Sequence, residues 1–176
     1  EAADRDATLA RLTDTKVYED LADVDLVVEV VAEDMGIKEE IFKTLDAICK
    51  PEAILATNTS SLSITQVASF TNRPERVIGM HFFNPVPMMK LVEVIKGQLT
   101  SDETHQTIVE VSKQIGKTPV TVNEAPGFVV NRILIPMVNE GIGILADGVA
   151  TKEEIDEAMK LGANHPMGPL ALADLI

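Results

Sequence analysis

His81 and Glu93 are the residues of this sequence whose types and surroundings most favour chemistry. His81 lies in the apolar run RVIGMHFF, residues 76–83, and Glu93 lies in the apolar run LVEVIKG, residues 91–97. A carboxylate beside an imidazole fixes the ring tautomer and favours the protonated ring, so such a pair can transfer a proton. A buried ion pair that serves only the structure has the same composition. Both interpretations require that the two side chains meet.

The connector NPVPMMK, residues 84–90, predicts that the two runs form an antiparallel hairpin. A parallel connection needs a crossover of about a dozen residues or more, and this connector is too short for one. If the hairpin is centred near Pro87, residues whose numbers sum to 174 lie opposite each other, and 81 plus 93 gives that sum. We therefore expect His81 and Glu93 to be cross-strand neighbours within side-chain reach.

Short β-branched runs predict the remaining strands of an α/β layer fold in residues 1–123. DLVVEVV at 25–31, AILATN at 53–58 and TPVTVN at 118–123 are typical of strands buried in a sheet. Amphipathic segments between the runs predict helices, so strands and helices alternate. In such folds the ligand crevice lies beyond the carboxyl ends of the parallel strands. The residues that follow each run are therefore candidates for a binding site.

Capping residues and helical spacing predict where the helices of this part lie. Ser63 and Thr100 each have a glutamine or glutamate three residues later, which is the spacing of a helix start. His105 falls in the first turn of the second of these helices, and we expect it to be solvated. Residues 36–50 predict an amphipathic helix whose core face carries Ile37, Ile41, Leu45, Ile48 and Cys49.

The pattern changes near residues 123–126, where the strand signals stop. PGFVVNRILIPMVNEGIGILADGVA is a long apolar helical pattern, and a second helix is predicted from Thr151, capped with Glu154, to Gly162. We therefore expect residues 1–123 to form an α/β domain and residues 124–176 to begin an all-α domain.

Composition excludes several classes of partner. The 28 acidic and 15 basic residues give a net charge of −13, which would repel nucleic acid and an anionic membrane surface. No apolar run is long enough for a membrane span. The lone Cys49 excludes an internal disulfide and favours a reducing, cytoplasmic location. No metal-binding motif occurs, so we expect no metal site.

Polar residues follow two of the predicted strands. NTSSL at 58–62 could bind a ligand oxygen, or Ser60 or Ser61 could simply cap the next helix. After the first strand, Glu33 and Lys38 could contact a ribose or a nicotinamide, or could be exposed charges of a first helical turn.

Asn131 is the remaining polar candidate. It lies within the apolar helical segment GFVVNRILI, where a buried amide requires hydrogen-bond partners. A role in a site and a structural role between domains are both compatible with this position.

Four blocks of the sequence together resemble the L-3-hydroxyacyl-CoA dehydrogenase family, most closely its bacterial 3-hydroxybutyryl-CoA branch. The blocks are ILATNTSSLSIT, GMHFFNPVPMMKLVEVI, APGFVVNRILIPMVNE and ANHPMGPLALADLI. The resemblance implies a partial Rossmann-type doubly wound sheet, followed by part of an all-α dimerisation domain. It also implies oxidation of the 3-hydroxyl of an (S)-3-hydroxyacyl-CoA, such as 3-hydroxybutanoyl-CoA, with NAD as the cofactor, NADP not being excluded, in a homodimer.

The family's functional residues match individual positions of this chain. By resemblance, His81 is the catalytic histidine, Glu93 is the carboxylate that pairs with it, and Ser60 and Asn131 contact the substrate. The positions that match the nicotinamide half of the cofactor site are Glu33, Lys38, Asn58, Ser60 and Asn84.

Departures from the family pattern leave other interpretations open. The family's GxGxxG turn does not occur in the chain, so we expect the chain to be an internal fragment that could be inactive by itself. A non-catalytic, crystallin-like relative is one alternative. A hydrolase with Ser60 as nucleophile is a weaker one, because NTSSL is not a GxSxG nucleophile elbow.

Overall fold

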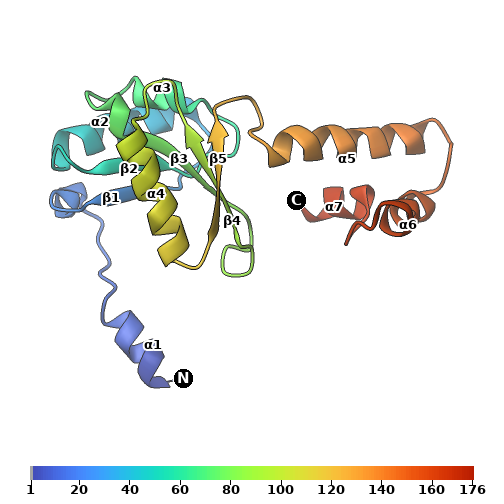
Figure 1. Cartoon of the computed structure of the whole chain (residues 1–176), viewed down its shortest axis with the longest axis horizontal. Coiled ribbons are helices and arrows are strands. Elements are labelled where there is room, and N and C mark those ends of the chain that lie inside the picture. Colours follow the sequence, from blue (N-terminus) through green and yellow to red (C-terminus); the bar gives the residue numbers. More distant parts are fainter. Residues whose placement is uncertain (1) are drawn as a thin grey trace. The chain divides into compact units, whose positions relative to one another are not determined.

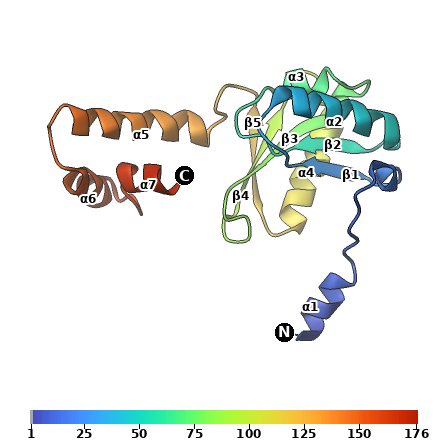
Figure 2. The ribbon, with the colours of Figure 1, turned by 180° about the vertical axis from the view of Figure 1, so that it is seen from behind.

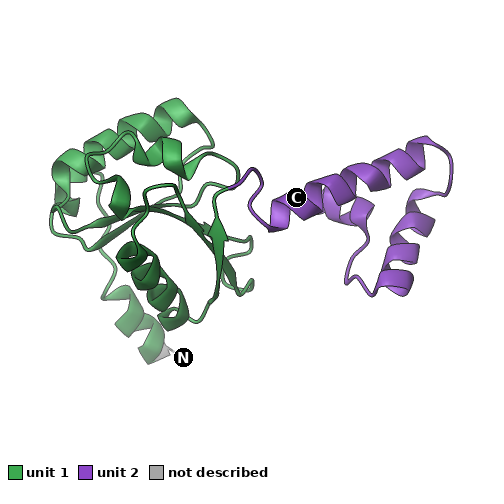
Figure 3. Cartoon of the chain, turned by 45° about the horizontal axis from the view of Figure 1, so that its top comes forward, with its two compact units in different colours: residues 1–124 green, residues 125–176 purple. Residues whose placement is uncertain are grey.

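The computed structural model describes residues 2–176, and the chain divides into two compact units. The first unit comprises residues 1–124 and the second comprises residues 125–176 (Figure 3). Within residues 2–176, no helix has the length and apolar character that a membrane crossing requires.

The first unit is built on a five-stranded mixed sheet whose strands lie side by side in chain order. The first three strands are parallel, the third and fourth form an antiparallel hairpin, and the fifth is parallel to the fourth. This sheet and its flanking helices confirm the predicted Rossmann-type α/β fold. The strands are β1 (Leu26–Glu29), β2 (Ile54–Thr57), β3 (Val77–Phe82), β4 (Leu91–Lys96) and β5 (Thr118–Asn123).

Helices cover both faces of the sheet. Helices α2 (Met35–Ile48) and α3 (Ile64–Ala68) lie over one face, and α4 (Asp102–Gln114) lies over the other, as the opposite views of Figures 1 and 2 show. The remaining elements of this unit are α1 (Ala2–Leu9) and the 3-10 turns η1 (Tyr18–Leu21) and η2 (Pro74–Arg76). One apolar core cluster packs α4 against the sheet and consists of Ile54, Ala56, Ile78, Met80, Val92, Val94 and Ile108.

The side chains of β3 and β4 alternate between the two faces of the sheet, and this alternation places His81 and Glu93 on the face away from α4. Met80 and Val92 belong to the cluster beneath α4, so their neighbours His81 and Glu93 point to the opposite face. Gly79 lies two residues before His81, and a Cβ at Gly79 would approach Ile64 of α3 to 3.0 Å. His81 and Glu93 are therefore on the face that α2 and α3 cover.

Helix α2 buries Leu45 and half-buries Ile41 and Ile48, as expected, but its first turn differs from the prediction. Asp34 caps the helix by accepting a hydrogen bond from the Ile37 amide, and this start leaves Ile37 44% exposed. The prediction that Ile37 belongs to the core is therefore wrong. Lys38 takes the first buried position and is followed at helical spacing by Phe42 and Leu45.

The predicted start of α3 is confirmed, whereas that of α4 is wrong by one residue. Ser63 accepts a hydrogen bond from the Gln66 amide at 3.1 Å and is the N-cap of α3. Ser101, rather than Thr100, caps α4 and accepts from the Thr104 amide. The Thr100 hydroxyl instead donates to the Val77 carbonyl at 2.7 Å, which ties the start of α4 to β3.

His105 is buried, so the expectation that it is solvated is wrong. It is 9% exposed because the inner face of α4 starts in the first turn and includes His105, Thr104 and Ile108. Its Nε2 lies 2.8 Å from the Thr121 hydroxyl of β5. Burial, together with the nearby Lys96 ammonium, lowers the pKa of His105 below its ordinary value of 6.5, although Asp102 opposes this shift.

Because the folded state lowers the pKa of His105, we expect it to make stability depend on pH. The unfolded chain binds the proton more readily, so the free energy of unfolding should fall as the pH drops below 6.5. Urea unfolding at about pH 7.5 and about pH 5.5 measures this loss. The His105→Gln variant should lose less stability over the same interval. Equal losses in the two proteins would contradict the assignment.

The second unit is helical, as predicted. It contains α5 (Val130–Ala146), α6 (Lys152–Ala163) and α7 (Pro169–Leu175). The capping box of Thr151 and Glu154 is present, but α6 continues past Gly162 to Ala163, and its C-cap residue is Asn164, whose φ is +56°. The Asp156 carboxylate accepts hydrogen bonds from the first free amides of α7 and so joins α6 to α7.

Candidate functional site

The β3–β4 hairpin brings His81 and Glu93 together in the predicted register. The His81 Nδ1 atom lies 2.9 Å from Glu93 Oε2. The two side chains are 5% and 1% exposed, so the carboxylate is shielded from competing water. A carboxylate at Nδ1 orients the imidazole so that Nε2 is the atom that can exchange a proton with a bound molecule.

Neighbouring residues hold the imidazole at the edge where the parallel strands end. The Phe83 ring lies 4.5 Å from the His81 ring, centroid to centroid, at an interplanar angle of 50°. Asn58, directly after β2, accepts a hydrogen bond from the Phe82 amide through Oδ1 at 2.8 Å. Asn58 therefore ties the carboxyl end of β2 to the residue that follows His81.

A buried ion pair lies at the same edge of the sheet. The Lys38 ammonium is 2.8 and 2.9 Å from the two carboxylate oxygens of Glu29, the last residue of β1. Lys38 is 0% exposed, so the interpretation of this lysine as an exposed first-turn charge is wrong. Glu33 lies 3.8 Å from the ammonium, and its side chain is 42% exposed.

Glu29 and Thr57 were not singled out from the sequence. The Thr57 hydroxyl donates to Glu29 Oε2 at 2.6 Å and joins the ends of β1 and β2. A signal for Glu29 exists in the run DLVVEVV, because a carboxylate inside a buried strand requires a cationic or hydrogen-bonding partner. Nothing in the local sequence distinguishes Lys38 from the other lysines as that partner.

The other candidate residues lie on three different segments of the chain. Ser60 lies in the loop between β2 and α3, and the capping role considered for Ser60 or Ser61 is wrong because Ser63 is the N-cap. Asn84 is exposed near the start of the loop between β3 and β4, before a cis bond to Pro85. Asn131 lies in the first turn of α5, in the second unit.

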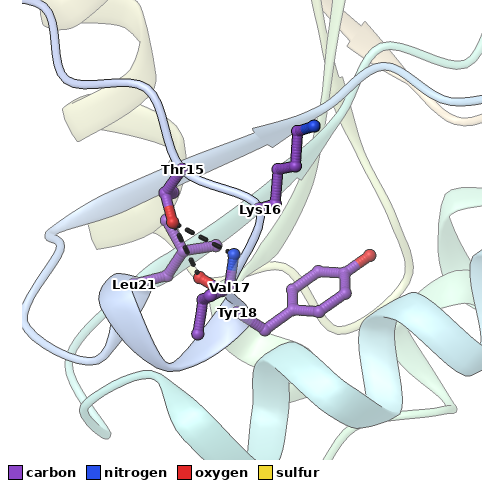
Figure 4. Close-up of a pocket in the computed structure, with 5 residues that line it drawn as sticks. All are labelled: Thr15, Lys16, Val17, Tyr18 and Leu21. Atoms are coloured by element: carbon purple, nitrogen blue, oxygen red, sulfur yellow. Dashed lines mark hydrogen bonds between the residues drawn. The ribbon is translucent and has the colours of Figure 1, made fainter.

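A hollow of about 300 Å³ in the segment that precedes β1 is lined by none of these residues (Figure 4). Its threonine hydroxyl is held by the backbone of Val17, as the dashed lines show. Neither an imidazole nor a carboxylate is among its lining residues, so it holds no counterpart of the His81 and Glu93 pair. Its lining residues are Thr15, Lys16, Val17, Tyr18 and Leu21. Across residues 2–176, no group of three or more metal-ligating side chains is arranged to hold an ion.

A Rossmann-like sheet with a buried imidazole and carboxylate near the ends of its parallel strands is typical of dinucleotide-dependent dehydrogenases. The family model described as 3-hydroxyacyl-CoA dehydrogenase, NAD binding domain, matches residues 1–125. The model described as 3-hydroxyacyl-CoA dehydrogenase, C-terminal domain, matches residues 127–176. The chain belongs to the 3-hydroxyacyl-CoA dehydrogenase family, and the resemblance seen in the four sequence blocks is confirmed.

Individual relatives support the same assignment. The chain is 70% identical to a 3-hydroxybutyryl-CoA dehydrogenase of Clostridioides difficile, over 96% of this chain and 60% of that protein. It is 57% identical to a probable 3-hydroxybutyryl-CoA dehydrogenase of Bacillus subtilis, over 97% of this chain and 59% of that protein. The crystal structure of an (S)-3-hydroxybutyryl-CoA dehydrogenase from Ralstonia eutropha superposes with a TM-score of 0.97 at 54% identity, covering 99% of this chain and 62% of that chain. The chain thus spans about three fifths of the length of these relatives.

Proposed function

We propose that the protein carrying this chain is an NAD-dependent dehydrogenase that interconverts (S)-3-hydroxybutanoyl-CoA and acetoacetyl-CoA, in butanoate or fatty-acid metabolism. The observation that carries the proposal is the buried contact of 2.9 Å between His81 and Glu93 at the end of the parallel strands. The names of the relatives support the C4 acyl-CoA as the substrate.

In this proposal His81 is the general base of the oxidation. Its Nε2 accepts the proton of the 3-hydroxyl group, and the Glu93 carboxylate stabilises the imidazolium that forms. Bound NAD would supply the acceptor for the hydride that leaves C3. In the reverse direction His81 returns the proton to the forming hydroxyl. Burial of the pair strengthens the interaction between the two charges, because little water screens it.

The donor and acceptor groups at the strand ends suit the nicotinamide half of NAD. Carboxylate and amide side chains bind ribose hydroxyls and carboxamides, and Glu33 offers an exposed carboxylate beside the ends of β1 and β2. We assign Ser60 and Asn131 to substrate binding. The residues assigned to the cofactor are Glu33, Lys38, Asn58, Ser60 and Asn84.

The two units have separate roles in this proposal. The first is the carboxyl-terminal part of the NAD-binding domain, and the second is the first part of a helical domain through which two copies form a homodimer. The acidic composition, with a net charge of −13, favours a small-molecule substrate over nucleic acid. Cys49 is a buried free thiol, which suits a reducing compartment such as the cytoplasm.

The proposal is tested by assaying the natural polypeptide that carries this chain. Purified protein is mixed with acetoacetyl-CoA and NADH, and the fall in NADH absorbance is followed. We expect turnover that depends on both compounds, with (S)-3-hydroxybutanoyl-CoA as the product. Binding of NADH without turnover would favour a non-catalytic, crystallin-like relative. Release of free thiol without consumption of NADH would favour hydrolysis.

A further inference from the structure

Glu29 is a buried carboxylate that occupies the end of β1 without any role in the proton transfer proposed above. It is 4% exposed, and each of its two carboxylate oxygens accepts two hydrogen bonds. Oε1 accepts from the Val31 amide at 2.6 Å and from Lys38 at 2.8 Å. Oε2 accepts from Lys38 at 2.9 Å and from Thr57 at 2.6 Å. One side chain thus joins β1, β2, α2 and the loop that leads to Glu33.

Glu29 also determines which carboxylate the Lys38 ammonium neutralises. The ammonium lies within 2.9 Å of Glu29 but 3.8 Å from Glu33, so its close partner is Glu29. The Glu33 carboxylate is held instead by hydroxyl groups, with Thr59 donating at 2.6 Å and Ser61 at 3.4 Å. Neutral hydroxyl donors leave its negative charge in place, and the side chain stays 42% exposed.

We propose that Glu29 is a positioning residue for the cofactor site: it retains Lys38 and so keeps the Glu33 carboxylate available to the hydroxyl groups of a ribose. The proposal rests on the function proposed above. A buried ammonium that loses its partner must find another acceptor or lose its charge. Glu33 is the nearest remaining carboxylate, so without the Glu29 charge Lys38 pairs with Glu33 and withdraws it from the cofactor.

The test uses the Glu29→Gln, Lys38→Met and double variants of the natural polypeptide, with the NADH assay. Glu29→Gln should raise the KM for NADH about tenfold, which corresponds to about 1.4 kcal/mol of binding free energy. The KM for acetoacetyl-CoA and kcat should stay within about threefold, because the reacting groups are unchanged. Direct titration of NADH fluorescence should give a matching change in Kd.

The double variant separates positioning through Lys38 from a general loss of structure. A residue that acts through Lys38 has little further effect once Lys38 is removed, so Glu29→Gln should change the KM for NADH by less than about twofold in the Lys38→Met protein. The double variant should also regain thermal stability relative to either single variant, because it buries no unpaired charge.

A matched control lies at the other end of the same helix. Asp46 and Arg73 form an ion pair of 2.7 Å whose side chains are only 7% and 11% exposed. The pair holds the carboxyl end of α2, because the Arg73 guanidinium donates to the Cys49 carbonyl. Asp46→Asn should therefore lower the melting temperature while leaving the KM for NADH unchanged.

The possible outcomes distinguish the positioning role of Glu29 from a role in general stability and from the proposed function. Wild-type turnover with an unchanged KM for NADH in Glu29→Gln would overturn the positioning role and leave the proposed function intact. An equal increase in Asp46→Asn, or an undiminished effect in the Lys38→Met protein, would show that Glu29 serves general stability. Wild-type protein that neither turns over nor binds NADH would overturn both proposals.

Discussion

Replacing His81 by glutamine is expected to lower kcat for the reduction of acetoacetyl-CoA by about 1,000-fold, within the range found for loss of a general acid or base. Glutamine has a similar reach and can accept a hydrogen bond, but it does not exchange a proton near neutral pH. The KM for NADH should change little, since His81 is assigned to the reacting oxygen rather than to the cofactor. Steady-state NADH absorbance measures both constants.

His105→Gln is the matched control for this variant. His105 is also buried and hydrogen-bonded, but its partner is Thr121 of β5, beneath α4. The same substitution there should leave kcat unchanged. If His81→Gln kept wild-type kcat, the pair would be an ion pair of the structure only, and the general-base assignment would be abandoned.

Replacing Glu93 by glutamine is expected to lower kcat by about 100-fold with little change in the KM for acetoacetyl-CoA, which is the pattern of an interaction that matters most in the transition state. The amide preserves the size of the side chain beside His81 Nδ1. It supplies no negative charge to the imidazolium, and it can present either an oxygen or an NH₂ group to the ring. The loss should therefore appear in kcat.

Stability has to be measured beside activity for the Glu93 variant, because Glu93 is 1% exposed. Circular dichroism and thermal unfolding show whether Glu93→Gln is folded at the assay temperature. Asp46→Asn removes a carboxylate charge from a comparable ion pair at the carboxyl end of α2, away from His81, and this variant should keep the wild-type kcat. Similar losses of kcat in the two variants would refute a specific role for Glu93.

The hairpin was predictable because its geometry follows from counting residues. The short connector excluded a crossover, and the strict alternation of strands then left few registers that bury the apolar residues. His81 and Glu93 face each other in the structure as that register requires. Their facing arrangement could therefore be inferred from two runs and a loop, before any other part of the fold was known.

The ion pair of Glu29 and Lys38 could not be found in the same way. Periodicity assigns a lysine to the exposed side of a helix, and here tertiary contacts override that rule because a buried carboxylate stabilises the ammonium. His105 illustrates the same limit. Its burial depends on a hydrogen-bond partner, Thr121 of β5, that is distant in the sequence and that helical spacing does not reveal. Single cap positions such as Ser101 depend on competition between adjacent hydroxyl residues, which the spacing does not resolve.

The β3–β4 hairpin also restricts how its loop can change. Residues that lie opposite each other share a face, and adjacent residues on one strand lie on opposite faces. If one residue were inserted into or deleted from 83–90 and the pairing of β3 with β4 shifted by one residue, Glu93 would lie opposite Met80 or Phe82 in place of His81. Glu93 and His81 would then point to opposite sides of the sheet. A change in the length of this loop would therefore separate the pair without altering either residue.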